Sequence, residues 1–186
     1  MHEDVPRPRT RMAPQQRQAI ILQSALRLFE EVGYEGASID AIAAASGISG
    51  PAIYRHFSGK AALLCALIED VVENAVAAME AALDEAADPL GAMADVMAER
   101  ALMGGSVIGL LQARLPAMAA AEQQRLDSLR ATLRGRLSAM VTMARPDLSE
   151  ESARTNVEAV LAVVGQSGRF DGARPLARVL RAILNA

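Results

Sequence analysis

The sequence contains few aromatic residues and no tryptophan, and this shortage limits the folds it can form. Only 3% of its 186 residues are aromatic, whereas 52% are hydrophobic. The core must therefore consist mainly of Ala, Leu, Val, Ile and Met. Ala, Leu and Met favour helices, while strands are enriched in aromatic and β-branched residues. The composition predicts an all-α protein.

Cysteine and long apolar segments are also scarce. The single cysteine, Cys65, cannot form a disulfide within the chain, which favours a reducing compartment. The Arg- and Pro-rich N-terminus lacks the apolar stretch of a secretory signal. The most apolar segment, residues 101–113, is interrupted by glycines and is too short to span a bilayer. We therefore expect a cytoplasmic protein with no membrane partner.

Histidine is represented only by His2 and His56. With one cysteine they cannot assemble a His/Cys metal site. The C-terminal two thirds contain no convergent acid/base or nucleophile set. We expect no metal, no cofactor and no enzymatic activity. Cys65 lies in an apolar stretch, which favours a buried structural thiol over a redox sensor.

Positive charge is in the minority, since the net charge is −3. The positive charge is unevenly distributed along the chain. Residues 1–60 hold seven Lys/Arg and six Asp/Glu, whereas the remainder holds twelve Lys/Arg and sixteen Asp/Glu. The first 29 residues alone carry five arginines against two acidic residues. A phosphate backbone could bind at this end, although a solvated surface explains the bias almost as well.

Apolar spacing and turn residues predict nine helices and no strand. Residues 1–13, rich in Pro and Arg, are expected to form a disordered arm. The helices are expected at about 14–32, 38–45, 49–57, 60–86 and 89–103, then a short one ending near 115, and others near 126–144, 149–168 and 174–185. We expect a DNA-binding domain at 14–59 and a second domain at 60–186.

Two short helices joined by a tight turn match a helix-turn-helix. Gly33 is expected to end the preceding helix in a left-handed conformation, and Ser38 to cap the first short helix. The turn is Ser46-Gly47-Ile48, and Ser49 and Pro51 suit the start of the second short helix. In this motif the second helix enters the major groove of DNA. A structural corner without DNA binding is the alternative.

Residues 17–64 resemble the TetR family of regulators in motif order and spacing. The similar runs are 25–34 (ALRLFEEVGY), 38–43 (SIDAIA), 47–49 (GIS), 53–57 (IYRHF) and 58–60 (SGK), followed by the leucine pair at 63–64. The resemblance implies a three-helix DNA-binding headpiece on a six-helix body that binds an effector and dimerises. It also implies a bacterial, nucleoid-associated location.

The resemblance implies DNA contacts of three kinds. Phosphate contacts are expected from the polar residues Ser38, Tyr54, His56 and Lys60. Base contacts are expected from Ser49, Gly50, Pro51, Ala52 and Arg55. Arm contacts are expected from Arg7, Arg9 and Arg11, which could equally be solvated charge. Many family members have polar residues at the positions of Gly50-Pro51-Ala52, so DNA shape and Arg55 should carry more of the specificity.

The body is expected to enclose a pocket for a small, largely apolar effector. The candidates are methionines at helical spacing and two arginines in apolar stretches: Met93, Met97, Arg100, Met103, Arg114, Met118 and Met140. Ordinary core packing of the methionines and surface exposure of the arginines are the alternatives. An acidic ligand group could bind Arg100 or Arg114.

A homodimer is expected because one short helix makes few base contacts, whereas two heads on a two-fold axis bind an inverted repeat. The last two helices would form the interface between the two copies, here called the dimer seam. Its candidate residues are Val157, Leu161, Val164, Gly165, Gly168, Val179 and Ile183. Internal packing of these residues is the alternative. Effector binding would spread the heads and release the operator. The alternatives are a helical adaptor that binds only proteins, a family member without a ligand, and an activator.

Overall fold

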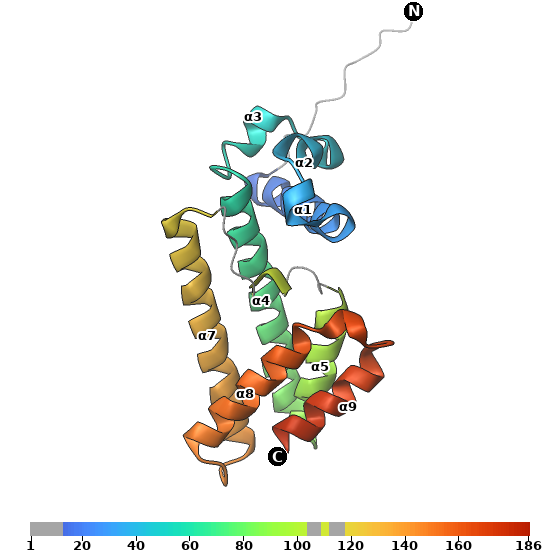
Figure 1. Ribbon diagram of the computed structural model, residues 1–186, viewed down its shortest axis with the longest axis vertical. Helices are drawn as coiled ribbons and strands as arrows, with labels where there is room; N and C mark the ends of the chain where they lie inside the picture. The colour runs from blue at the N-terminus through green and yellow to red at the C-terminus, as the bar shows by residue number, and fades with distance from the viewer. Residues whose placement is uncertain (1–12, 104–108, 112–117) are drawn as a thin grey trace, which may run out of the picture.

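The computed structural model describes residues 13–103, 109–111 and 118–186 (Figure 1), and every regular element in these ranges is helical. The elements are α1 (Pro14–Gly36), α2 (Ile39–Ser46), α3 (Gly50–Ile53), α4 (Lys60–Glu85), α5 (Pro89–Met103), α7 (Ala120–Ala144), α8 (Glu150–Val164), the 3₁₀ helix η1 (Ser167–Arg169) and α9 (Ala173–Leu184). The predicted all-α class is confirmed. The predicted helix ending near residue 115 lies mostly outside the described residues.

Helices α1 to α3 form a small head at one end of the long helix α4 (Figure 1). Its core is made of buried side chains from all three helices and from the segment that follows them: Ile21, Ala25, Phe29, Ile42, Ile53 and Phe57. The Phe29 and Tyr34 rings are tilted against each other with centroids 5.5 Å apart. An aromatic pair of this geometry adds stability beyond the area it buries.

The remaining helices form a body around the rest of α4, which packs on α5 and on α7. Helix α9 packs on α5 and α8, and α8 also contacts α7. Helices α4 and α7 run parallel, since Glu69 pairs with Arg125 near one end and Glu80 pairs with Arg136 further along both helices. In the described part of the chain, no helix combines the length and apolarity needed to cross a membrane.

Within the head, two predicted helix ends differ from the structure. Helix α1 continues to Gly36, but across a kink at Gly33, whose φ of 74° is the positive value expected there. The helix predicted at 49–57 ends at Ile53. The chain then tightens into turns, in which the His56 N–H donates to the Ile53 carbonyl over 2.8 Å. This tightening accompanies burial of the Phe57 ring in the head.

Candidate nucleic-acid interface and body cavity

The turn between α2 and α3 is held by backbone and capping hydrogen bonds. The Ser38 hydroxyl accepts from the Ala41 N–H over 3.1 Å, as an N-cap should. Gly47 lies in the left-handed region with φ 66° and ψ 20°, which costs little without a Cβ. The Ile48 N–H then donates to the Ala43 carbonyl over 3.1 Å. These bonds set the angle at which α3 leaves α2.

Helix α3 presents one face to solvent and the other to the head. Ser49, Pro51, Tyr54 and Arg55 are exposed, and 57% of the Tyr54 surface is accessible. The Ser49 backbone begins the helix, but its hydroxyl makes no capping bond. That hydroxyl is therefore not committed to the helix end and can point to a ligand.

Ala52, predicted to contact bases, is only 7% exposed, so its side chain offers little surface to DNA. Gly50 and His56 are half-buried. The His56 ring lies 6.3 Å from the Phe57 ring, centroid to centroid, so it is held partly against the head. Arg7, Arg9 and Arg11 lie outside the described residues.

Lys60 joins the head to α4. Its ammonium donates to the Tyr34 carbonyl over 2.7 Å and lies 4.4 Å from the centroid of the Tyr34 ring. The Glu35 carboxylate is 4.0 Å away. Burial, and secondly the charge of Glu35, raise the pKa of the Tyr34 phenol, so the ring stays neutral beneath the cation. A phosphate would have to bind Lys60 in addition to these partners.

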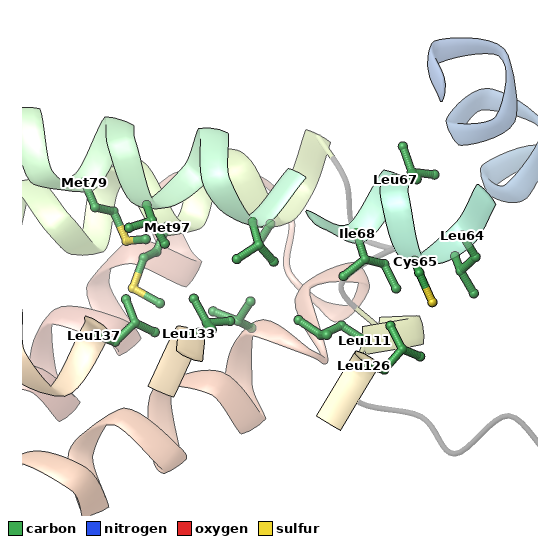
Figure 2. Close-up of a cluster of buried hydrophobic side chains, with 14 of the residues drawn as sticks. Leu64, Cys65, Leu67, Ile68, Met79, Met97, Leu111, Leu126, Leu133 and Leu137 are labelled. Carbon is green, nitrogen blue, oxygen red and sulfur yellow. The ribbon is translucent and has the colours of Figure 1, made fainter. Parts of the chain in front are cut away.

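The body contains a cavity of about 250 Å³ between α4, α5, α7 and α8. Its apolar lining is Val71, Val72, Ala75, Met79, Val96, Met97, Leu111, Leu133, Leu137, Leu161, Ala162 and Val164. The Met79, Met97, Leu133 and Leu137 side chains lie close together at one end of the cluster in Figure 2. The polar lining consists of Arg100, Arg130, Arg134 and Glu158.

Two of the predicted effector-pocket residues, Met97 and Arg100, line this cavity. The other predicted methionines are described by the structure but are not among the lining residues of the cavity. Met93 and Met140 are buried in the packed core about one helical turn from the lining residues of α5 and α7. Met103 is 70% exposed, and Met118 is half-buried. Arg114 lies outside the described residues.

Most of the cavity wall was missed from the sequence, including the side of α4 and the arginines of α7. These residues occupy apolar stripes or their edges, and a stripe that faces a void has the same spacing as one that faces a core.

The three arginines of the lining, Arg100, Arg130 and Arg134, differ in their partners. Arg130 donates to the Leu111 carbonyl and pairs with Asp127. Arg134 pairs with Glu158 at 2.5 Å.

The predicted dimer seam is only partly available on the surface. Val157 and Val164, two of the predicted seam residues, are only 1% and 4% exposed within the subunit, so they offer little surface to a partner. Leu161 lines the cavity. Gly165 and Ile183 are half-buried, whereas Gly168 and Val179 are exposed. The break after α8 is anchored to α5, since the buried Ser167 hydroxyl donates to the Ala101 carbonyl over 3.2 Å.

A helix-turn-helix head on a long helix that continues into an all-helical body defines a class of DNA-binding regulatory proteins. Residues 21–67 match the bacterial regulatory proteins of the tetR family. Over these residues the chain is similar to that family.

Individual relatives support the head and the fold separately. The transcriptional activator FasR of Mycolicibacterium smegmatis is 35% identical over 78 residues, which are 42% of this chain and 36% of FasR. The match thus spans about a third of that relative's length. FadR of Bacillus halodurans has the same fold, with a TM-score of 0.75 at 16% identity over 94% of this chain and 96% of its own. FadR of Bacillus subtilis, solved with stearoyl-CoA, also has this fold. Its TM-score is 0.71 at 17% identity, and the match covers 90% of this chain and 95% of that FadR chain.

Proposed function

We propose that the protein regulates transcription as a homodimer that binds an inverted-repeat operator and is released by a small, largely apolar effector. One observation carries this proposal. Helix α4 begins at the Lys60 contact with the head and, about three turns later, forms a wall of the cavity with Val71, Val72 and Ala75. A ligand that moves this wall would move the head. The site of action would be DNA in the cytoplasm.

DNA binding would use the exposed face of α3. Tyr54 and Arg55 supply a hydroxyl and a guanidinium on that face, and Ser49 supplies a second hydroxyl at the start of the helix. A guanidinium can pair with guanine in the major groove or with a phosphate. Ser38 and Lys60 would contact phosphate from the flanks of the motif, with the Ser38 hydroxyl also capping α2.

Dimerisation would use the exposed faces of α8 and α9. Glu150 and Glu151 are exposed at the start of α8, and Arg174 and Arg178 are exposed on α9. When two copies meet about a two-fold axis, α8 of one copy can face α9 of the other, so these opposite charges favour that pairing. Val179, which is 38% exposed, supplies apolar contact on the same helix.

Effector binding is supported by the apolar cavity and by the stearoyl-CoA held by the Bacillus subtilis neighbour. The ligand would favour a body conformation in which α4 holds the two heads at the wrong separation. The operator affinity then falls by the ratio of the ligand's affinities for the two conformations.

The test is fluorescence anisotropy with duplex DNA from upstream of the chain's own coding region. Arg55→Met should weaken binding at least about fivefold, since a guanidinium contact to DNA contributes about 1–3 kcal/mol. Arg100→Met is the matched control, because it removes one exposed guanidinium from the body rather than from the head. Equal affinities of these two variants would contradict the α3 interface, and a monomer in sedimentation at micromolar concentration would contradict the dimer.

An activator is the second candidate, and the name of FasR is the observation that favours it. Both candidates need the same head and dimer. They differ in the effect of deleting the gene, since loss of a repressor raises transcription of the regulated gene and loss of an activator lowers it. Transcript levels in the deletion strain distinguish them.

A further inference from the structure

The cavity lining combines apolar side chains with charged ones, which is not the lining expected for a neutral apolar ligand. Among the lining residues that the structure describes, twelve are apolar, three are arginines and one is a glutamate. None of these described residues is a Ser, Thr, Tyr, Asn, Gln or His. A ligand's polar group therefore meets either hydrocarbon or charge. Resting on the regulatory function proposed above, we propose that the effector is a compact amphipathic anion whose negative group binds Arg100.

The charge balance of the lining favours an anion. Three guanidinium groups face one carboxylate, that of Glu158, which is already paired with Arg134. The excess positive charge lies beside low-dielectric apolar walls, where the attraction for an anion is stronger than in bulk water. Guanidinium groups only donate hydrogen bonds, so they bind carboxylate, sulfonate or phosphate oxygens and repel an ammonium group.

Arg100 is the arginine best placed to take that charge. Arg130 is committed to the Leu111 carbonyl and to Asp127, and Arg134 is committed to Glu158. In the described ranges, Arg100 has no hydrogen bond or ion pair of its own. Arg100 is exposed in the last turn of α5 and also lines the cavity, so this residue lies where the apolar chamber meets solvent.

The rest of the ligand must be apolar and short. Met79 and Met97 lie opposite Leu133 and Leu137 in Figure 2, and flexible thioethers adapt to the shape of a hydrocarbon. The volume of about 250 Å³ is below the roughly 300–1,000 Å³ of sites that hold drug-sized ligands. A medium-chain carboxylate combines the required charge, length and hydrocarbon surface.

The experiment compares three probes of equal chain length by isothermal titration calorimetry near neutral pH: octanoate, 1-octanol and octylammonium. Octanoate should bind the dimer at least about tenfold more tightly than octanol, because one charge-assisted hydrogen bond is gained. Octylammonium should bind more weakly than octanol. Hexadecanoate should bind no more tightly than octanoate. Octanol that binds as tightly as octanoate would overturn the proposal.

Two variants locate the binding, with a third as the control. Arg100→Met keeps the side-chain length and should lower octanoate affinity about tenfold while leaving octanol affinity unchanged. Ala75→Leu fills part of the cavity and should weaken both probes. Arg55→Met, which removes an exposed guanidinium from the head, should change neither. Unchanged octanoate affinity in Arg100→Met, or no binding of any probe, would overturn the proposal.

The outcome for the ligand is separable from the outcome for regulation. If octanol binds as well as octanoate and releases the operator, the anion proposal fails and ligand-responsive regulation stands. If octanoate binds through Arg100 without changing operator affinity, the anion site stands and ligand-responsive regulation by this ligand class fails.

Discussion

The head, α1 to α3, and the body, α4 to α9, differ in where their candidate functional groups lie. In the head they are exposed on and directly after α3, and a small buried core holds them in place. In the body they surround a space that the side chains leave unfilled. A packed core supports a surface that must keep its shape, whereas an incompletely packed one leaves room for a ligand to change the packing. The two regions meet at the start of α4, where Lys60 contacts the Tyr34 carbonyl of the head.

The largest effect is expected from truncating the head core. Phe29 is 1% exposed, so Phe29→Ala should destabilise the head by about 3–5 kcal/mol. DNA binding should be lost while octanoate binding in the body persists. Thermal unfolding by circular dichroism measures the change. Val32→Ala on the same helix is the control, since Val32 is 54% exposed and should have little effect. Equal loss of both activities would show that head and body unfold together.

A smaller effect should distinguish the cavity from the packed core within α7. Leu126 is fully buried in the core, and Leu126→Ala should cost about 2–5 kcal/mol. Leu133 borders the cavity, so its side chain already lacks contacts on one side. Leu133→Ala should therefore cost less than Leu126→Ala in urea unfolding. The reverse order would mean that the cavity is closed in solution.

The turn of the head should be moderately sensitive. Gly47 has φ 66°, and a Cβ in this left-handed conformation costs about 1–2 kcal/mol. Gly47→Ala should lower stability by about 1 kcal/mol, because reduced freedom of the unfolded chain offsets part of that cost. Gly47→Asn is the control and should cost less, since Asn tolerates this region. Unfolding midpoints in urea would test both, and a neutral Gly47→Ala would contradict the observed turn.

The smallest effect is expected on the ion pairs between α4 and α7. Arg125 pairs with Glu69, and both side chains remain partly exposed. Arg125→Met should lower stability by less than about 1 kcal/mol, and the loss should shrink further in high salt. Stability measured at low and high ionic strength checks this. A salt-insensitive loss would show that the hydrocarbon stem of Arg125, rather than its charge, supports the contact.

The sequence predicted the head in more detail than the body. The caps at Ser38 and Gly47 act within a few residues, so local spacing was enough to place α2 and the turn. The end of α3 was missed because burial of Phe57, a contact with the rest of the head, shortens the helix. In the body, Met93 and Met97 are the same residue type on the same apolar stripe of α5, yet only Met97 borders the cavity. The sequence could not distinguish them, because the cavity forms where α5 meets α4, α7 and α8.

The Lys60 contact has a consequence for how such proteins can be recombined. Its shortest bond joins the ammonium to a main-chain carbonyl, that of Tyr34, rather than to a particular side chain. Every amino acid supplies that acceptor, so the bond survives replacement of the side chains at positions 34 and 35 as long as the backbone keeps its course. A head of different DNA preference could thus be grafted onto this body at residue 60 while the Lys60 bond to the backbone is kept.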